Sequence, residues 1–207
     1  MTISLFKMKR AVADICLADK RFQAVVDGNQ LCTIGRRPSQ VSHFESLVES
    51  VVSQQLAIRA ADTIHGRLLT LANGKITPHK IAKLAPEEMR AAGLSGAKTK
   101  TILGLSNAAL TGQVAIKNLH LLEDEIVAAQ LTSLWGIGPW TVDMFMMFQL
   151  GRLDIWPTGD LGVRRGWERI HNLKEEIEPT KLMARGEKFR PHRSIVAWYC
   201  WRALENK

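Results

Sequence analysis

The chain has 207 residues, which allows one domain or two small lobes, and its 46% hydrophobic content is enough for a packed core. Lysine and arginine total 28 against 20 aspartate and glutamate, so the formal net charge is +8 and a polyanionic partner is favoured. Such a charge balance would also suit binding to a membrane surface or to an acidic protein. No run of 18 apolar residues occurs, which excludes a membrane-spanning helix.

The first part of the chain has the pattern of helices joined by turns. Residues 4–17 have apolar side chains at helical spacing, whereas residues 27–40 predict a loop, with a short strand as an option at 31–34. A long helical pattern covers 42–69, but residues 53–56 (SQQL) place polar groups on its apolar stripe. By pattern alone, this interruption is equally well explained as a polar face of one helix.

Helix start signals continue beyond residue 70. Thr77-Pro78 and Ala85-Pro86 are typical of helix starts. Residues 96–111 predict a helix with Lys98 and Lys100 near its start, where they oppose the helix dipole unless other contacts compensate them. Further helices are predicted at 123–130, 140–150, 161–172, 179–187 and 191–204, the last with Pro191 in its first turn. The predicted fold class is all-α.

A glycine turn, Gly136-Ile137-Gly138, joins two of these helices. Glycine can adopt a positive φ and leaves no Cβ in the way of a ligand, and Pro139 suits the first turn of a helix. The N–H groups of residues 138–141 then point out of a helix N-terminus, an arrangement that binds phosphate. The alternative is an ordinary corner between helices, which is the more common case for so short a motif.

The stretch around this turn is more specific than its glycines. From Leu131 to Gly166 it runs LTSLWGIGPWTVDMFMMFQLGRLDIWPTGDLGVRRG, with an aspartate twenty positions after Trp140. This order of motifs resembles the helix-hairpin-helix (HhH-GPD) glycosylase superfamily. Trp140, the run DIWPTGDLGVRRG and the later RPHRSIVAWYCWR are similar to its 3-methyladenine DNA glycosylase II branch, and the resemblance covers residues 40–205.

The resemblance implies an all-α fold of two helical lobes with a cleft between them. One lobe would comprise residues 1–42 and 155–207, and the other residues 43–154, with the hairpin at 131–150. Bacterial members of that branch carry an additional N-terminal β-sheet domain, for which this chain is too short. The implied activity is monofunctional: alkylated bases such as 3-methyladenine and 7-methylguanine are flipped out of duplex DNA and excised by hydrolysis.

Asp160 matches the catalytic carboxylate of the family. Positive charge develops on the sugar as the glycosidic bond breaks, and a carboxylate stabilises it and orients the attacking water. Asp160 is also well placed as the N-cap of the next helix, and the two roles are compatible. Asp154 and Asp143 are weaker candidates. Bifunctional members have a nucleophilic lysine at position 140, so Trp140 predicts hydrolysis without AP lyase activity.

Trp140, Trp201 and Met144 match base-pocket positions of the family. An indole face attracts a cationic ring by about 0.5–2 kcal/mol, and purines alkylated at N3 or N7 are cationic. All six tryptophans lie between positions 135 and 201, although clustered tryptophans more often mark a core. Met144 and Arg202 stand where tyrosines are expected, so the pocket is less aromatic and the range of substrates stays open.

The DNA contacts follow from the same resemblance. Gln55 matches the side chain that fills the gap left by a flipped base, in a short connection between two helices, with Gln54 as the alternative. The positions that match backbone-binding residues are Gly136, Gly138, Thr141, Arg165 and Arg193. The carbonyl groups of Thr132, Leu134 and Ile137 match a candidate site for a monovalent cation.

Three separated cysteines, Cys16, Cys32 and Cys200, predict neither a disulfide framework nor a zinc site. With only Cys200 near the C-terminus, we expect no four-cysteine iron–sulfur cluster. We expect a monomer without a cofactor that acts on damaged double-stranded DNA and not at a membrane. The start of the chain has no secretory signal, so the expected compartment is the bacterial cytoplasm, at the nucleoid, or the eukaryotic nucleus.

Two other functions fit the sequence. Helix-hairpin-helix motifs also occur in DNA-binding modules that perform no chemistry, although Asp160 and the tryptophans argue against such a module. Removal of uracil or other deaminated bases is a closer rival, because it is also a glycosylase reaction. Base release from methylated DNA distinguishes these alternatives.

Overall fold

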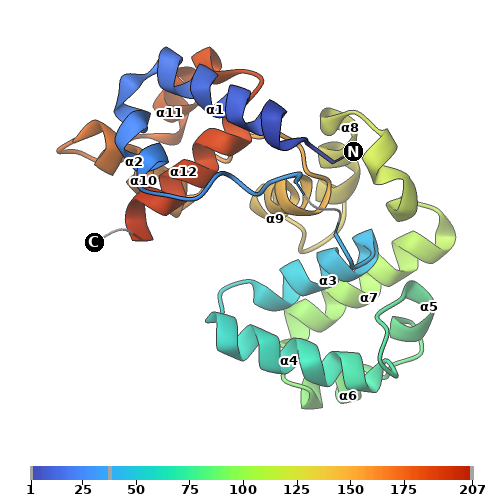
Figure 1. Cartoon of the computed structure of the whole chain (residues 1–207). Coiled ribbons are helices and arrows are strands. Elements are labelled where there is room, and N and C mark those ends of the chain that lie inside the picture. The colour runs from blue at the N-terminus through green and yellow to red at the C-terminus, as the bar shows by residue number, and fades with distance from the viewer. Residues whose placement is uncertain (1, 37–38, 206–207) are drawn as a thin grey trace. The chain divides into compact units, whose positions relative to one another are not determined.

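The computed structural model describes residues 2–36 and 39–205, and all regular structure in these ranges is helical (Figure 1). The α-helices are α1 Leu5–Ala18, α2 Gln23–Asp27, α3 His43–Ser53, α4 Ile58–Leu71, α5 Pro78–Ile81, α6 Pro86–Ala91, α7 Gly96–Thr111, α8 Asp124–Thr132, α9 Pro139–Met144, α10 Leu161–His171, α11 Pro179–Gly186 and α12 Arg193–Glu205. Three short 3-10 segments, η1 Lys20–Phe22, η2 Ile116–Leu121 and η4 Glu187–Phe189, and a π-helix, η3 Phe145–Gln149, complete the described part.

The helix starts follow the capping signals of the sequence. Ser42 caps α3 by accepting a hydrogen bond from Glu45 N at 3.2 Å, and Thr77 caps α5 in the same manner. Such side chains satisfy N–H groups that have no partner within the helix. The polar residues 53–56 mark a break between α3 and α4, not a polar face of one helix.

Three details differ from the predicted elements. Residues 31–34 form no strand, and the described part of the chain contains none. Pro191 lies outside α12, which begins two residues later at Arg193, so this proline precedes the first turn instead of occupying it. The helix after the glycine turn keeps α-geometry only to Met144 and continues as the π-helix, which sequence periodicity cannot distinguish.

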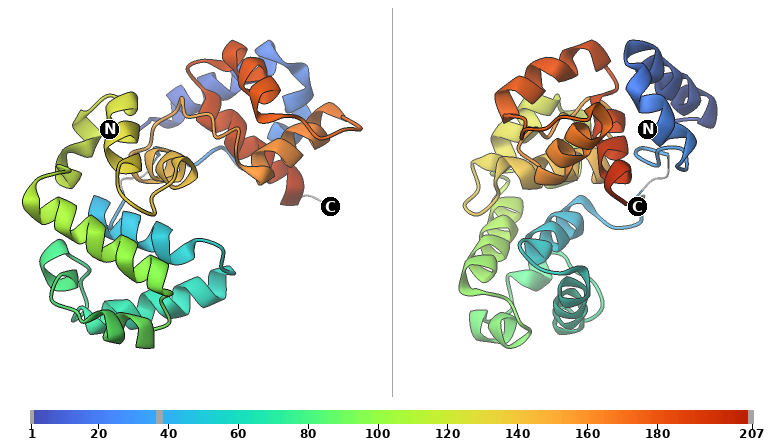
Figure 2. Two further views of the ribbon diagram at one scale, coloured as in Figure 1. Left: turned by 180° about the vertical axis from the view of Figure 1, so that it is seen from behind. Right: turned by 90° about the vertical axis from the view of Figure 1, so that its left-hand side faces the viewer.

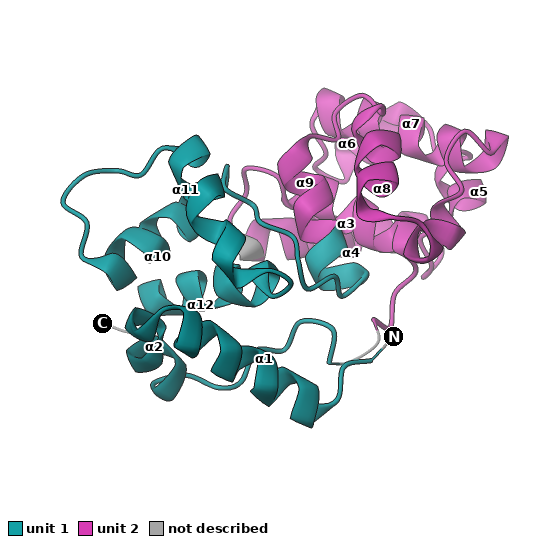
Figure 3. Cartoon of the chain, turned by 90° about the horizontal axis from the view of Figure 1, so that it is seen from above, with its two compact units in different colours: residues 1–38, 146–207 teal, residues 39–145 magenta. Residues whose placement is uncertain are grey.

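The chain divides into two compact units (Figure 3). Unit 1 comprises residues 1–38 and 146–207, and unit 2 comprises residues 39–145. The lobe boundary expected at 154/155 and the unit boundary at 145/146 differ by the nine residues between them. These nine residues hold most of the π-helix, so they belong to the same unit as Asp160.

Unit 1 is built around α12, which packs closely along α10 (Figure 2). The two helices approach closely because Gly166 has no side chain: a Cβ there would overlap the backbone carbonyl of Cys200. Behind them, the rings of Phe22, Trp167 and Phe189 form an edge-on and tilted aromatic cluster. The register of α10 on α12 is therefore fixed by a glycine contact and an apolar core.

Unit 2 has α3 at its centre, in contact with α4 and α7 (Figure 1). Leu47, Val48, Val51 and Val52 are fully buried and follow the apolar stripe that the sequence predicts. Among the residues described, no helix is both long and apolar enough to cross a bilayer. The core of this unit thus fixes the end of α3 and the connection that follows it.

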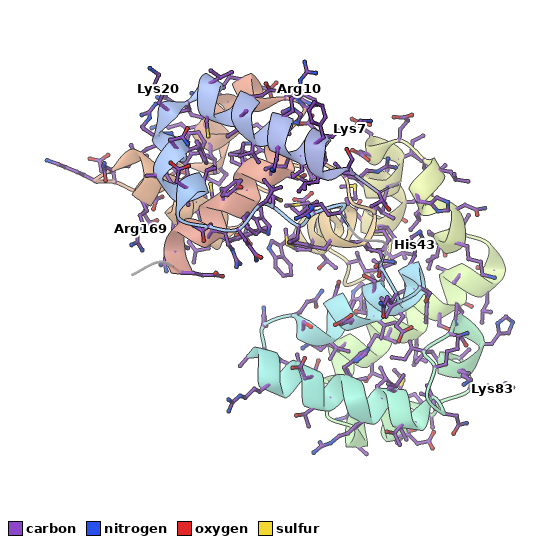
Figure 4. The ribbon with its side chains drawn as sticks, viewed as in Figure 1. Lys7, Arg10, Lys20, His43, Lys83 and Arg169 are labelled. Atoms are coloured by element: carbon purple, nitrogen blue, oxygen red, sulfur yellow. The ribbon has the colours of Figure 1, made fainter. Side chains whose placement is uncertain are left out.

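The positive charge is distributed over the surface of both units. Lys7, Arg10, Lys20 and Arg169 of unit 1 and Lys83 of unit 2 are exposed, and their side chains extend away from the ribbon (Figure 4). A distributed charge of this sign attracts a polyanion without selecting a sequence.

Candidate functional site

The glycine turn between α8 and α9 packs on α7. Gly136 has a φ of +81°, and a Cβ at this position would overlap the side chain of Thr101. Ile137 is buried, and its N–H donates to the carbonyl of Leu134 at 3.2 Å. Glycine is therefore required at position 136 both for the backbone conformation and for the close contact with α7.

Gly138 differs from Gly136. Its φ is −90°, which any residue adopts, so the turn itself does not require glycine at this position. A Cβ there would meet no atom within 4 Å, and as the N-cap of α9 it offers no side chain to the first turn. The absence of a side chain at 138 thus leaves open space at a helix N-terminus, which suits the approach of a phosphate.

The carbonyl groups of Thr132, at the end of α8, and of Leu134 and Ile137 lie along the connection to α9. The Leu134 oxygen accepts a hydrogen bond from Ile137 N. Among the described residues, no backbone N–H group outside the helices donates to the oxygen of Thr132 or of Ile137. Uncharged oxygen ligands are hard donors that suit an alkali cation. The donor set is therefore compatible with the predicted cation site.

The connection between α3 and α4 presents two glutamines in different directions. Gln54 Nε2 donates to Thr141 Oγ1 at 3.1 Å and, at a longer 3.4 Å, to the carbonyl of Gly136. Gln55 is exposed and has a φ of +56°, in the left-handed region that a residue with a side chain seldom adopts. Strain of this kind is concentrated at functional loops. Gln55 is thus the better placed of the two to enter a duplex.

The Thr141 side chain is separate from the N–H group through which the hairpin is predicted to approach a phosphate. Thr141 is only 2% exposed, and its hydroxyl accepts the hydrogen bond from Gln54. The Thr141 side chain therefore links α9 to the α3–α4 connection within unit 2, and the predicted contact with DNA remains that of its backbone N–H.

Asp160 is the N-cap of α10, as the sequence predicts. Its Oδ1 accepts hydrogen bonds from Val163 N at 2.7 Å and from Trp201 Nε1 at 2.9 Å. The first bond orients the carboxylate on its own helix and the second connects it to α12. The half-buried carboxylate is held in one orientation by two donors on the same oxygen, which is the preorganisation that electrostatic catalysis requires.

A glycine makes the contact between Asp160 and Trp201 possible. A Cβ on Gly162 would lie 2.8 Å from Trp201 Cδ1, 2.9 Å from Trp201 Nε1 and 3.1 Å from Asp160 Oδ1. Any side chain at 162 would therefore displace the indole from the carboxylate. Sequence reasoning did not single out Gly162, because its role depends on α12, which lies about forty residues further along the chain.

Phe148 is a further candidate that the sequence did not reveal. Its ring stacks on that of Trp201, with centroids 5.8 Å apart and planes inclined by 29°, and the side chain is 53% exposed. It belongs to the π-helix, a geometry that often occurs at functional sites. In the sequence, Phe148 ends the apolar run FMMF, which predicted only that it would be one more core residue. The exposed ring of Phe148 thus stacks on the half-buried ring of Trp201, whose Nε1 contacts Asp160 in unit 1.

The tryptophans divide between core and surface. Trp156, Trp167 and Trp198 are buried in unit 1, as clustering favours. Trp135 and Trp140 of unit 2 are exposed, and Met144 is half-buried. The structure thus leaves Trp140 accessible to a ligand.

Arg202, at the second position where a tyrosine is expected, makes its contacts within unit 1. Its guanidinium lies over the Trp198 ring at 5.1 Å and pairs with Glu205 at 2.6 Å. The arginine therefore covers a core tryptophan instead of adding an aromatic face to the pocket.

Arg193 was expected to contact the DNA backbone, and the structure contradicts this. Its side chain is 9% exposed, with Nε 2.8 Å from Asp154 Oδ1 and Nη1 3.2 Å from Glu187 Oε1. Arg190 also pairs with Asp154 at 2.8 Å. A buried guanidinium with these partners connects α12 to η4 and to the segment between η3 and α10 that holds Asp154. Arg165 of α10 is exposed and keeps its candidate role.

The cysteines of unit 1 are not arranged for metal binding. Cys32 and Cys200 are buried, and burial raises the pKa of the Cys32 thiol to about 12 and that of Cys200 further still. No cluster of three or more histidine, cysteine or acidic side chains suited to a metal occurs among the residues that the structure describes. These thiols are protonated at neutral pH.

Comparison with known proteins identifies the family. The family model described as HhH-GPD superfamily base excision DNA repair protein matches residues 48–191. This chain belongs to that superfamily. The HhH-GPD match spans the hairpin, Gln55 and Asp160, and it confirms the family that the motifs predict.

Proteins similar to this HhH-GPD chain were found both by sequence and by structure. DNA-3-methyladenine glycosylase 1 of Schizosaccharomyces pombe is 35% identical over 77% of this chain and 71% of its own length. A crystal structure of DNA-3-methyladenine glycosidase from Bacillus halodurans has a TM-score of 0.84 at 32% identity and covers 95% of this chain and 89% of that one. A 3-methyladenine DNA glycosylase from S. pombe in complex with abasic DNA has a TM-score of 0.82 at 30% identity, with 93% and 95% covered. The predicted all-α glycosylase fold is thereby confirmed.

Proposed function

We infer that this protein is a DNA glycosylase of base excision repair that excises alkylated bases of the 3-methyladenine and 7-methylguanine type from duplex DNA. The observation that carries the proposal is the Asp160 carboxylate, fixed by Val163 N and Trp201 Nε1 beside the exposed ring of Phe148 and the half-buried ring of Trp201. Relatives named 3-methyladenine glycosylases, one of them crystallised with abasic DNA, support the substrate class.

Asp160 and the aromatic side chains have different parts in the proposed reaction. The carboxylate stabilises the positive charge that develops on the sugar and orients the water that attacks C1′. The rings of Trp201 and Phe148 in unit 1 attract a cationic base by the cation–π effect, and we propose the same role for the exposed ring of Trp140. An alkylated purine carries this charge already and leaves as a neutral base, so recognition and leaving-group quality favour the same substrates.

The substrate class can be tested by release of bases from two duplexes, one methylated and one containing uracil. We expect chromatography to detect 3-methyladenine and 7-methylguanine from the first and no uracil from the second. Tight DNA binding with no base released from either duplex would support a non-catalytic module. Release of uracil alone would support a glycosylase for deaminated bases.

We propose that the enzyme is monofunctional, because Trp140 stands where bifunctional members have a lysine nucleophile. An indole has no amine that could form a Schiff base with the sugar. Borohydride treatment during turnover should therefore trap no covalent protein–DNA complex, and the strand at the abasic product should stay intact on a denaturing gel. A trapped complex that survives denaturation would contradict this assignment.

Gly138 is proposed as the point at which the hairpin approaches the DNA backbone. We expect Gly138→Val to lower the affinity for damaged and undamaged duplexes alike, by about 10-fold, since phosphate contacts carry no sequence information. Fluorescence anisotropy measures the affinity, and circular dichroism should show a native helix content because the added Cβ meets no protein atom. Gly104→Val, at another open position, is the control. Unchanged DNA affinity in a folded Gly138→Val variant would remove the hairpin from the interface.

Gln55 is proposed as the side chain that occupies the gap left by the extruded nucleotide. We expect Gln55→Ala to slow single-turnover excision from a fully paired duplex by about 10-fold, because unstacking a base costs a few kcal/mol. The loss should be much smaller when the damaged base is mismatched and already weakly paired. Gln113→Ala, an exposed glutamine elsewhere in unit 2, is the control. An equal loss on both duplexes would exclude the wedge role.

The remaining expectations stand as proposals. The exposed Arg165 contacts the DNA backbone, and the carbonyls of Thr132, Leu134 and Ile137 hold a monovalent cation in the hairpin. The protein works as a monomer without an iron–sulfur cluster and acts where chromosomal DNA lies, in the nucleoid or the nucleus.

A further inference from the structure

Lys98, in the first turn of α7, reaches the C-terminal end of α3. Its Nζ donates to the carbonyl of Val52 at 2.8 Å and to that of Gln54 at 2.7 Å. The last four carbonyls of a helix have no partner within it, and an ammonium there also meets the negative end of the helix dipole. Lys98 thus caps α3 and fixes the backbone directly ahead of Gln55.

The same connection is held a second time, by the side chain of Gln54. Its amide donates to Thr141 Oγ1, and Thr141 of α9 is buried. Residue 54 is therefore held through its carbonyl by α7 and through its amide by α9, all within unit 2. The next residue, Gln55, is exposed and keeps the left-handed φ of +56°.

The position of Lys98 is unfavourable for the lysine itself. It lies at the N-terminal end of α7, where the dipole opposes a cation, and burial lowers the pKa of its ammonium. Lys100, two residues later, instead lies over the exposed ring of Trp135 at 4.2 Å. Lys98 and Lys100 both oppose the dipole of α7, and each has a different compensating contact. Only Lys98 contacts the connection between α3 and α4, which carries Gln55.

We propose that Lys98 is a positioning residue for base extrusion, which holds Gln55 in the strained conformation that enters the duplex, while Gln54 couples this connection to the hairpin. This inference rests on the proposed role of Gln55. Lys98 touches neither the base nor the sugar, so its loss should slow the formation of the extruded state and leave the chemistry at Asp160 unchanged.

The test uses Lys98→Met, which removes the ammonium but keeps most of the side-chain length. The first measurement is the fluorescence of 2-aminopurine placed next to the damaged nucleotide, which brightens on unstacking and requires no catalysis. We expect the brightening to be slower by about 10-fold. The second is the ratio of single-turnover excision rates on paired and mismatched duplexes, which should fall as it does for Gln55→Ala.

Three further variants make the result specific. Lys98→Arg retains charged donors and should restore both measurements, whereas Lys117→Met, which removes a charge from an exposed site of unit 2, should change neither. Gln55→Ala combined with Lys98→Met should be no slower than Gln55→Ala alone, since the two act in one step. An equal loss on both duplexes, or no loss, would overturn the proposal.

Two controls keep the outcome interpretable. If circular dichroism shows that Lys98→Met does not fold, Lys98→Gln takes its place. Its side chain is polar but uncharged and one bond shorter, so it loses the ammonium contact with the two carbonyls, and the same ratio should fall. If the wild-type protein releases no base at all, the proposed function fails, and the 2-aminopurine signal still decides whether Lys98 acts on extrusion.

Discussion

Replacing Asp160 by asparagine should abolish base release while leaving the affinity for duplex DNA nearly unchanged. The amide retains an oxygen that can accept the hydrogen bonds from Val163 N and Trp201 Nε1, so the local structure should persist. It lacks the negative charge that stabilises the developing cation on the sugar. Losses of about 100- to 1,000-fold follow the removal of one such electrostatic partner, and we expect at least this. Single-turnover base release and fluorescence anisotropy measure the two quantities.

The control for this variant is Asp27→Asn, which removes an exposed carboxylate from α2 of the same unit and should leave the rate unchanged. Wild-type rates for Asp160→Asn would contradict the assignment. Asp154 would then be the next candidate, although its ion pairs with Arg190 and Arg193 give it a structural role already.

Replacing Gly166 by alanine should have the largest effect on stability. The added Cβ would overlap the carbonyl group of Cys200, which is backbone and cannot move without shifting α12 against α10. Overpacking of this kind typically costs about 1–3 kcal/mol, and here it would also displace Trp201, the residue after Cys200. We expect a lower midpoint of thermal unfolding, followed by circular dichroism, and a slower base release at temperatures where the variant is folded.

Gly104→Ala is the matched control for this prediction. Gly104 lies inside α7, where an added Cβ meets no atom within 4 Å. Alanine is favoured over glycine in a helix by about 0.5–1 kcal/mol, so this variant should be as stable as the wild type or more so. A Gly166→Ala protein with an unchanged unfolding midpoint would show that α10 and α12 are not in close contact at this point.

Local signals predicted the parts of the molecule that depend on local chemistry. The N-caps, the glycine turn and the helix limits follow from side chains that lie within four residues of the groups they satisfy. The N-cap role of Asp160 was predicted in this way, whereas its catalytic role was predicted from the family resemblance. The break at residues 53–56, in contrast, was decided by the family pattern and not by periodicity.

The features that were missed depend on partners distant in sequence. Gly162 and Gly166 resemble ordinary helix interior glycines until α12 is placed on α10. Arginine side chains usually lie at the surface, but the guanidinium of Arg193 is buried, and the carboxylates of Asp154 and Glu187 balance its charge. Phe148 is directed to the surface beside Trp201 by the π-helix, whose wider turn leaves no periodic signal in so short a run. Each of these contacts requires tertiary information.

The measurement that tests the central claim most directly is a crystal structure of the wild-type protein with a duplex that contains one 7-methylguanine on a 2′-fluoro sugar, which resists cleavage. We predict that the nucleotide is extruded, with its C1′ against the Asp160 carboxylate, its base against the ring of Trp201, and the Gln55 side chain in the vacated stack. A base that stays within the duplex, or a sugar bound away from Asp160, would contradict the account.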